Sequence, residues 1–455
     1  MIFLKYHYIM MFKLEEIIKA TNAEVIKNTT NKDFFTISTD TRKISGGEIY
    51  LPLKGESFDG ENFLDKAIES SAEGCFISRD DYPESANLVL KVKDTKSAYL
   101  QLANFLRKKY TPKVIAITGS SGKTTTKELI YSVMNEKFKT HKTFSNHNNE
   151  IGFCETLMTM PTDTQVLIVE MGMRGLGEID LLSKYSEPDY AVITNAGSAH
   201  IGRLGSLDNI AKAKSEIVHY LNPNGVLIAQ NNERIKKFAE FAGEKIFYQL
   251  DDTQIIERKP SYSKFIYKGN EYELNVEGDY NVENSLAAIE LGYLLGLKYE
   301  EIKRGLAAYK PIEKRWELQI INGYSIINDS YNANPESMKA AVSTFLKLYP
   351  NPVVVLGNMG ELGENSAEFH REVGRYLKTI KESQKAIFLT VGNLANEISE
   401  ELNGTAIFVK NFENNDEVSK YIVDNVNVGT TIFLKASRSM KFEEIIEKLK
   451  GEIKV

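Results

Sequence analysis

Cysteine is nearly absent from this chain of 455 residues, which contains only Cys75 and Cys154. Two cysteines argue against a disulfide framework and against a zinc site built from cysteine ligands. The net charge is −6, so no overall positive field favours nucleic acid as a partner. No apolar run approaches the ~18–20 residues of a membrane span. We therefore expect no membrane span and a cytoplasmic location.

The first residues, MIFLKYHYIMMFKLEEII, are apolar, but the run is short and contains Lys5. It also lacks the small-residue cleavage site of a signal peptide. Met10 and Met11 offer an alternative start, which would make residues 1–10 an extension.

The length exceeds what one hydrophobic core can fill, since single cores stop growing near ~250–300 residues. Residues 1–110 alternate short apolar runs with helix-like stretches and close with TKSAYLQLANFLRKKY, whose apolar residues recur at helical spacing. The proline in the following YTPK disfavours helix and marks a first boundary. This block predicts a small α/β domain.

The second block, residues 111–312, contains the apolar runs KVIAITG, VLIVEMG, YAVITNAG and GVLIAQNN, with helical stretches between them. This alternation predicts a mostly parallel sheet covered on both faces. KFIYKGNEYELNVEG alternates around Gly269-Asn270, which predicts a hairpin. NVENSLAAIELGYLLG predicts a helix ended by glycine.

The third block, residues 313–455, repeats the pattern with the runs YSIINDS, PVVVLGNMG, KAIFLTVG, TAIFVK and TTIFLKASR. It predicts a second α/β sheet of Rossmann type. The whole chain is thus predicted to be an α/β protein of three domains: a small substrate domain, a central parallel-sheet ATPase domain with a phosphate loop, and a C-terminal Rossmann-like domain.

The stretch ITGSSGKTTTKE is similar to the phosphate-loop pattern G-x-x-x-x-G-K-[ST], with Ile117 in the place of the first glycine. Gly119 and Gly122 would let backbone N–H groups approach phosphate oxygens at a helix N-terminus. Lys123 could reach the outer phosphates, and the Thr124 hydroxyl could bind Mg²⁺. A plain strand–turn–helix is the alternative interpretation.

Two further side chains lie at places where open α/β sheets bind ligands, and a third lies on a helical stretch. Glu170 ends the apolar run VLIVE, where a carboxylate is costly unless it is paired or bound to metal. His200 follows the run YAVITNAG, and Lys214 lies on the helical stretch LDNIAKAKSEIV. The alternatives are a cap or ion pair for Glu170, a structural role for His200 and a solvated Lys214.

Six stretches occur in a consistent order: TGSSGKTTTKE, NHNNEIG, VEMGM, AHIGRLGSLDNIAKAKSEI, DSYNANPES and KASRSMKFE. Together they resemble the Mur ligases over nearly the whole chain from about residue 11. The shortened glycine loop with Ile117 also follows the pattern of that family. The resemblance implies that Lys123 and Thr124 hold ATP phosphates and Mg²⁺. It also implies that Glu170 binds Mg²⁺ and that His200 helps to bind a second ion.

The resemblance further implies that CO₂ carbamylates Lys214, which turns an ammonium into an anion beside two cations. The implied catalytic residues are Lys123, Lys214, His200 and Glu170, and the implied metal ligands are Thr124, Glu170, His200 and carbamylated Lys214. The implied nucleotide-binding residues are Gly119, Ser120, Ser121, Gly122, Lys123, Thr124, Thr125, Asn281, Asn284, Arg315 and Asp329.

Within the nucleotide-binding set, the resemblance assigns separate parts of ATP to separate residues. Asn281 and Asn284 correspond to asparagines near adenine, although Tyr280 stands where the family usually has histidine. Arg315 corresponds to an arginine directed at the nucleotide phosphates. Asp329 corresponds to an aspartate at the ribose hydroxyls.

The stretch STDTRKISGGEIYLPLKGESFDGENF resembles the family's domain for the UDP-sugar-peptide, which implies that Thr39, Asp40, Thr41 and Arg42 bind this substrate. The stretch DSYNANP, with Asn332 and Asn334 as further substrate residues, resembles the member that joins D-alanyl-D-alanine to UDP-N-acetylmuramoyl-tripeptide. Two positions depart from the family pattern: Asn358 replaces aspartate in LGNMGELG, and Ala436 replaces the commoner glycine in LKASR.

The implied activity is an ATP-dependent amide ligation through an acyl phosphate, in peptidoglycan precursor synthesis. The implied partners are ATP, UDP-N-acetylmuramoyl-tripeptide and D-alanyl-D-alanine, with two Mg²⁺ ions, and we expect a monomer. A sister ligase with another amino acid acceptor, including folylpolyglutamate synthase-like enzymes, is the nearest alternative. A small-molecule kinase and a catalytically silent nucleotide-binding scaffold are the others.

Overall fold

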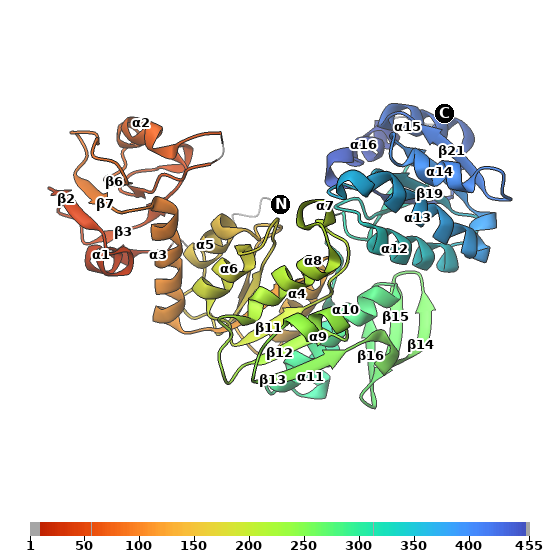
Figure 1. The fold of residues 1–455 in the computed structure, drawn as a ribbon, viewed down its shortest axis with the longest axis horizontal. Coiled ribbons are helices and arrows are strands. Elements are labelled where there is room, and N and C mark those ends of the chain that lie inside the picture. Colours follow the sequence, from red (N-terminus) through yellow and green to blue (C-terminus); the bar gives the residue numbers. More distant parts are fainter. Residues whose placement is uncertain (1–9, 56, 313, 452–455) are drawn as a thin grey trace. The chain divides into compact units, whose positions relative to one another are not determined.

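A computed structural model of the chain describes residues 10–55, 57–312 and 314–451 (Figure 1). The proposed extension falls almost entirely in residues 1–9, which lie outside the described residues. So does residue 313, the first of the predicted third domain. Among the described helices, none combines the length and the apolar composition that a bilayer crossing requires.

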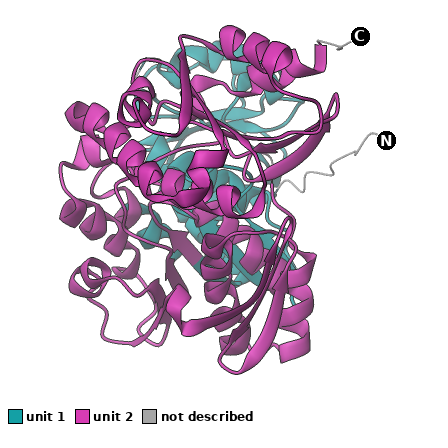
Figure 2. Cartoon of the chain, turned by 90° about the vertical axis from the view of Figure 1, so that its right-hand side faces the viewer, with its two compact units in different colours: residues 1–115, 138–171, 181–188 teal, residues 116–137, 172–180, 189–455 magenta. Residues whose placement is uncertain are grey.

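The chain divides into two compact units, which Figure 2 colours teal and magenta. The first comprises residues 1–115, 138–171 and 181–188, and the second comprises residues 116–137, 172–180 and 189–455. The division falls inside strand β8 (Lys113–Thr118). The domain boundaries at 110/111 and 312/313 stay predictions.

The first unit contains a five-stranded sheet in the order β2-β7-β6-β5-β4. β2 pairs with β7 in the antiparallel direction, and the other neighbours are parallel. Helix α3 begins where the Asp94 carboxylate accepts the Ser97 N–H at 2.6 Å and ends at Tyr110, before Pro112, as predicted. The elements are β1 (Phe12–Lys13), α1 (Leu14–Thr21), β2 (Glu24–Asn28), β3 (Phe34–Phe35), β4 (Ile37–Ser38), β5 (Ile49–Tyr50), α2 (Leu64–Glu69), β6 (Gly74–Ile77), β7 (Leu88–Lys91) and α3 (Thr95–Tyr110).

The central sheet has six strands in the order β13-β12-β11-β8-β10-β9. β9 with β10, β11 with β12 and β12 with β13 are parallel pairs. Every residue of β10 is buried, which explains its continuous apolar run. The elements are α4 (Lys123–Met134), β9 (Thr140–Lys142), α5 (Glu150–Met158), β10 (Val166–Glu170), α6 (Glu178–Ser186), β11 (Tyr190–Ile193), α7 (Ile201–Leu204), α8 (Leu207–Ser215), β12 (Val226–Gln230), α9 (Glu233–Phe238) and β13 (Glu244–Tyr248).

Strand β8 is the point where the order of this sheet reverses, because its neighbours β10 and β11 lead outward in opposite directions along the sheet. In open α/β sheets, the carboxyl ends of the strands at such a reversal form the ligand-binding crevice. The predicted phosphate loop follows the carboxyl end of β8.

A three-stranded antiparallel sheet follows, with strands β14 (Thr253–Lys259), β15 (Tyr262–Tyr267) and β16 (Asn270–Leu274). The predicted hairpin is confirmed, because Tyr267 and Asn270 pair across a turn in which Lys268 and Gly269 have φ of 48° and 78°. The predicted helix is α10 (Asp279–Leu294), and Gly296 follows it at φ 74°. Helix α11 (Tyr299–Ala308) comes next.

The C-terminal sheet has the order β17-β18-β22-β19-β20-β21, in which β17 and β18 are antiparallel and the other neighbours parallel. Helices surround its strands in Figure 1. The predicted Rossmann-like character is present, although the last strand lies between the second and third. The elements are β17 (Glu317–Ile321), β18 (Tyr324–Asn328), α12 (Pro335–Leu348), β19 (Val353–Gly357), α13 (Ser366–Thr379), β20 (Ile387–Val391), α14 (Asn396–Leu402), β21 (Phe408–Phe412), α15 (Asn415–Asn425), β22 (Thr431–Lys435) and α16 (Glu443–Gly451).

Candidate active site

The phosphate loop connects β8 to α4 and leaves no room for side chains at its two glycines. Gly119 has φ 155°, and a Cβ there would lie 1.8 Å from the Thr194 hydroxyl oxygen. Gly122 has φ 78°, and a Cβ there would lie 2.5 Å from Oδ1 of Asn284. Both glycines are therefore required by close approach and by backbone conformation.

Lys123 is the first residue of α4, and its ammonium donates a hydrogen bond to the Gly119 carbonyl at 2.7 Å. The lysine thus folds back across the loop. Thr124 is buried beside it, and Ser120 is also buried, whereas Ser121 and Thr125 are partly exposed.

Lys214 lies on α8 and is only 1% exposed, which rules out a solvated side chain. Burial lowers the pKa of its ammonium well below the ordinary value, and the positive charge of Lys123 lowers this pKa further. The two predicted lysines therefore act on each other electrostatically.

The two residues after β11 anchor the phosphate loop, although the sequence interpretation did not single them out. Oδ1 of Asn195 accepts the N–H groups of Ser120 and Ser121 at 3.1 and 2.9 Å. Its Nδ2 donates to the carbonyl and the hydroxyl oxygens of Ser121 at 3.1 and 2.9 Å. The Thr194 hydroxyl donates to the same carbonyl at 2.6 Å. Their position directly after a buried strand was the available signal.

Both predicted adenine-side asparagines are buried on α10, but they make different contacts. Asn284 lies against Gly122 of the phosphate loop. Asn281 uses Nδ2 to donate to the Glu277 carbonyl at 2.7 Å. The structure therefore brings Asn284 directly to the loop.

His200 adopts a left-handed conformation with φ 67° just before α7. Its Nδ1 lies 2.6 Å from Oε2 of Glu361, and the hydrogen bond to His200 lowers the pKa of the Glu361 carboxyl. The Glu361 carbonyl also accepts the Gly202 N–H at 3.1 Å. Glu361 belongs to the stretch LGNMGELG, whose pattern gave no direct sign of this contact.

Asp329 and Arg315 each have a neighbour that positions them. Asp329 pairs with Lys435, which is 3% exposed and which the sequence did not mark as a site residue. The guanidinium of Arg315 lies 4.0 Å from the ring centre of Tyr331. Arg315 Nε is buried without a hydrogen-bond partner among the described residues.

The two asparagines of the stretch DSYNANP have local hydrogen bonds. Asn334 is the N-cap of α12, since its Oδ1 accepts the Ser337 N–H at 2.8 Å. Oδ1 of Asn332 accepts the neighbouring Ala333 N–H at 2.9 Å. If Asn334 binds substrate, it would do so with the side-chain hydrogen-bonding positions that the cap does not use.

Glu170 is 2% exposed at the end of β10, in the first unit. Its Oε1 accepts Nδ2 of Asn148 at 2.9 Å, and its backbone N–H donates to the Thr143 hydroxyl at 3.0 Å. The segment that precedes α5 thus contacts the Glu170 carboxylate through Asn148 and the Glu170 backbone through Thr143.

Also in the first unit, Asp40 and Arg42 form a two-point pair. Nε and Nη2 of Arg42 lie 2.9 Å from the two carboxylate oxygens of Asp40. The hydrogen bond from Arg42 lowers the pKa of Asp40 to about 2. Thr39 and Thr41 are partly exposed beside this pair.

Asn358 stands where the family pattern has aspartate, and it keeps a contact that an aspartate could also make. Oδ1 of Asn358 accepts the Ala395 N–H at 2.8 Å, which an aspartate oxygen could also do. At the other departure, Ala436 is fully buried, and its Cβ lies 2.7 Å from the point that a Cβ on Gly357 would occupy. Neither position carries a group that the predicted chemistry needs.

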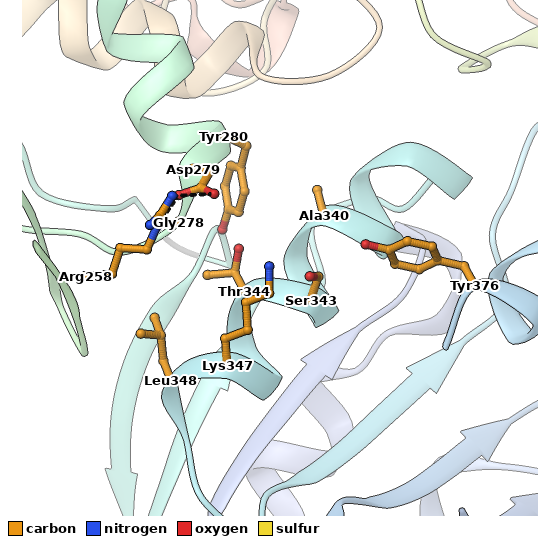
Figure 3. Close-up of a pocket in the computed structure, with 10 residues that line it drawn as sticks. All are labelled: Arg258, Gly278, Asp279, Tyr280, Ala340, Ser343, Thr344, Lys347, Leu348 and Tyr376. Atoms are coloured by element: carbon orange, nitrogen blue, oxygen red, sulfur yellow. Dashed lines mark hydrogen bonds and ion pairs between the residues drawn. The ribbon is translucent and has the colours of Figure 1, made fainter. Parts of the chain in front are cut away.

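A separate cavity of about 250 Å³ lies between the N-terminus of α10 and helix α12 (Figure 3). Nε of Arg258 lies 2.6 Å from Oδ1 of Asp279 at its wall, and Tyr280, Thr344 and Lys347 also line it. The lining includes none of the residues predicted to bind substrate, nucleotide or metal.

Over the described part of the chain, His, Cys, Asp and Glu side chains form no group of three or more that could hold a metal ion. The predicted ligand set contains only one carboxylate and one histidine, together with Thr124 and Lys214. Its completion would therefore require oxygen atoms from a modified lysine or from a bound phosphate.

Comparisons with known proteins agree with this architecture. The sequence model of the Mur ligase middle domain matches residues 117–292, and that of the Mur ligase glutamate ligase domain matches residues 314–438. The chain belongs to the Mur ligase family.

Among its relatives is the UDP-N-acetylmuramoyl-tripeptide–D-alanyl-D-alanine ligase of Bacillus subtilis, 37% identical over 94% of this chain and 97% of the relative. The corresponding ligase of Haemophilus influenzae is 32% identical over 92% and 94%. The crystal structure of MurF from Acinetobacter baumannii has a TM-score of 0.89 at 29% identity, and the match covers 98% of this chain and all of that chain.

Proposed function

We propose that this chain is the ligase that joins D-alanyl-D-alanine to UDP-N-acetylmuramoyl-tripeptide at the expense of ATP. The observation that carries the proposal is the extent of the similarity to the Bacillus subtilis ligase, which spans 94% of this chain. It therefore includes the first block, which neither family model covers. This is where the resemblance places the UDP substrate.

The proposed reaction has two steps. The terminal carboxylate of the tripeptide attacks the γ-phosphorus of ATP, which gives an acyl phosphate and ADP. The amine of D-alanyl-D-alanine then attacks the acyl carbon, and phosphate leaves from the tetrahedral intermediate. The chain contributes the glycine loop, whose backbone approaches the phosphates, and Lys123, whose positive charge screens two anions that must meet.

The residues present fit a carbamate on Lys214. Only a neutral amine reacts with CO₂, and both the burial of Lys214 and the charge of Lys123 favour the neutral amine. The product would be an anion close to a lysine ammonium. We propose that Lys214 carries this modification in the active protein.

The residues also fit Mg²⁺, which would supply charge neutralisation of the phosphates when bound. Thr124 and Glu170 offer hard oxygen atoms. Because Nδ1 of His200 faces Glu361 at 2.6 Å, His200 would use Nε2. We propose that these residues and the carbamylated Lys214 hold the two ions.

The remaining site residues receive the roles that the family resemblance implies. Thr39, Asp40, Thr41 and Arg42 would bind the UDP substrate within a domain of residues 1–110. The central domain, residues 111–312, would bind ATP with Asn281 and Asn284 near adenine. The third domain, residues 313–455, would bring Arg315 and Asp329 to the nucleotide and Asn332 and Asn334 to the incoming dipeptide.

The deciding experiment is a phosphate-release assay with purified protein, ATP, Mg²⁺ and UDP-N-acetylmuramoyl-tripeptide, with D-alanyl-D-alanine either added or withheld. We expect phosphate release to depend on the dipeptide and to match the amount of amide product. The Lys123→Ala variant should be folded and inactive. Phosphate release that ignores the dipeptide would contradict the proposal.

The same assay separates the alternatives. A small-molecule kinase would release ADP without an amide product, and a silent scaffold would release neither. A ligase with another acceptor would respond to a single amino acid instead of the dipeptide.

A further inference from the structure

Asn195 spans the phosphate loop with both ends of its side-chain amide. Its Oδ1 accepts two consecutive backbone N–H groups, those of Ser120 and Ser121. Its Nδ2 donates to two oxygen atoms of Ser121, the carbonyl and the hydroxyl. These four contacts, between 2.9 and 3.1 Å, use the full hydrogen-bonding capacity of an asparagine side chain.

The orientation of this amide is fixed by its neighbours. Two backbone N–H groups can face only an acceptor, and a carbonyl can face only a donor, so a flipped amide would oppose like groups at three contacts. The four hydrogen bonds therefore allow only one orientation of the Asn195 amide. Asn195 therefore recognises the conformation of the backbone at Ser120 and Ser121.

Ser121 directly precedes Gly122 and Lys123, so its backbone sets the direction in which α4 begins. The Ser121 carbonyl accepts hydrogen bonds from both Nδ2 of Asn195 and the Thr194 hydroxyl. The Ser120 hydroxyl donates to the Gly197 carbonyl at 2.9 Å. The segment after β11 thus holds the loop along its length.

We infer that Asn195 is the positioning residue that holds the phosphate loop ready for the nucleotide. The inference rests on the proposed function, because the loop must bind ATP for its preorganisation to matter. With the N–H groups of Ser120 and Ser121 engaged by Asn195, the loop is held in the backbone conformation that leads into the first turn of α4, and helix N-termini are the places where phosphate binds. Asn195 acts through the loop and does not touch the reacting atoms.

Two substitutions separate the functions of the amide. Asn195→Ala removes all four hydrogen bonds. Asn195→Asp keeps an acceptor for the two N–H groups but removes both donors and places a carboxylate against the Ser121 carbonyl. The matched control is Asn232→Ala, because Oδ1 of Asn232 likewise accepts two backbone N–H groups, those of Arg234 and Ile235 at the start of α9.

The measurement is the Kd of Mg-ADP and the Kd of the UDP-muramoyl-tripeptide for each protein, by calorimetry, together with the melting temperature. We expect Asn195→Ala and Asn195→Asp to raise the Kd of Mg-ADP by about tenfold or more, because each variant loses at least two of the four hydrogen bonds that hold the loop. The Kd of the UDP substrate should stay within about twofold. Asn232→Ala should lower the melting temperature and leave both Kd values unchanged.

A second comparison tests the contact between Asn195 and Ser121. Ser121→Ala removes one acceptor of Nδ2 and should weaken Mg-ADP binding in the wild-type background. In the Asn195→Ala background it should have no further effect.

The outcomes distinguish this inference from the proposed function. Wild-type protein that binds no Mg-ADP would overturn both. Wild-type protein that binds Mg-ADP, with Asn195 variants that bind it equally well, would overturn the inference alone. Equal weakening of Mg-ADP and UDP-substrate binding would show general loss of structure and would also overturn it.

Discussion

Nδ1 of His200 lies 2.6 Å from Oε2 of Glu361. A carboxylate on one ring nitrogen fixes the tautomer and orientation of a histidine that binds metal through the other. Glu361→Gln should therefore raise the Mg²⁺ concentration for half-maximal ligase activity by about 10–100-fold. The control is Glu364→Gln, an exposed carboxylate in the same segment. An unchanged Mg²⁺ requirement in Glu361→Gln would count against this role.

The same contact predicts a pH dependence of stability. The hydrogen bond to His200 lowers the pKa of Glu361 below 4.5, so the folded state binds fewer protons at this carboxyl than the unfolded state. This contribution is present above pH 4.5 and is lost as the pH falls through the folded pKa. The melting temperature of the wild type should therefore fall more steeply below pH 4.5 than that of Glu361→Gln. If the melting temperatures of the two proteins fell equally with pH across this window, the prediction would be contradicted.

Gly119 gives a steric test of the phosphate loop. Gly119→Ala should abolish nucleotide binding, because the new Cβ would meet the Thr194 hydroxyl at 1.8 Å and displace the loop. The matched control is Gly404→Ala, at φ 73° with no heavy atom within 4 Å of its Cβ. That variant should show only the backbone cost of about 1–2 kcal/mol in urea unfolding, with unchanged Kd for Mg-ADP. Normal binding by Gly119→Ala would show that the loop tolerates a side chain.

Substitution of Lys435 tests how much its ion pair with Asp329 contributes to stability. Lys435→Met would leave a largely buried carboxylate without its cationic partner, which is expected to cost ~3 kcal/mol of unfolding free energy. Lys450→Met removes a half-exposed lysine paired with Glu447 and should cost less than ~1 kcal/mol. Urea denaturation measures both. Equal costs would mean that the pair with Asp329 contributes no more than a surface ion pair.

Lys214 offers a direct chemical signature. Protein equilibrated with ¹³C-bicarbonate should give a carbamate carbon resonance that is absent from Lys214→Arg, since a guanidinium stays charged and does not form the carbamate. The variant should also be inactive. A wild-type spectrum without this resonance, in active protein, would remove the proposed modification.

The buried strands of the central and C-terminal sheets could be predicted from the sequence because they are continuous apolar runs. Strands β9, β13 and β17 escaped prediction, since their partly exposed residues carry no such run. The phosphate loop was predictable because glycine, lysine and threonine occur at fixed spacing between a strand and a helix. The contacts of Asn195, Glu361 and Lys435 were not, because each joins segments that only the fold brings together.

The seclusion of Lys214 has a consequence for how the protein would be kept active. A side chain with 1% exposure is shielded from bulky electrophiles, whereas dissolved carbon dioxide is a small, linear and uncharged molecule. Dialysis against degassed buffer would then inactivate the enzyme slowly and reversibly, and addition of bicarbonate alone would restore its activity. The activity of the enzyme would then depend on the supply of carbon dioxide through one atom, Nζ of Lys214.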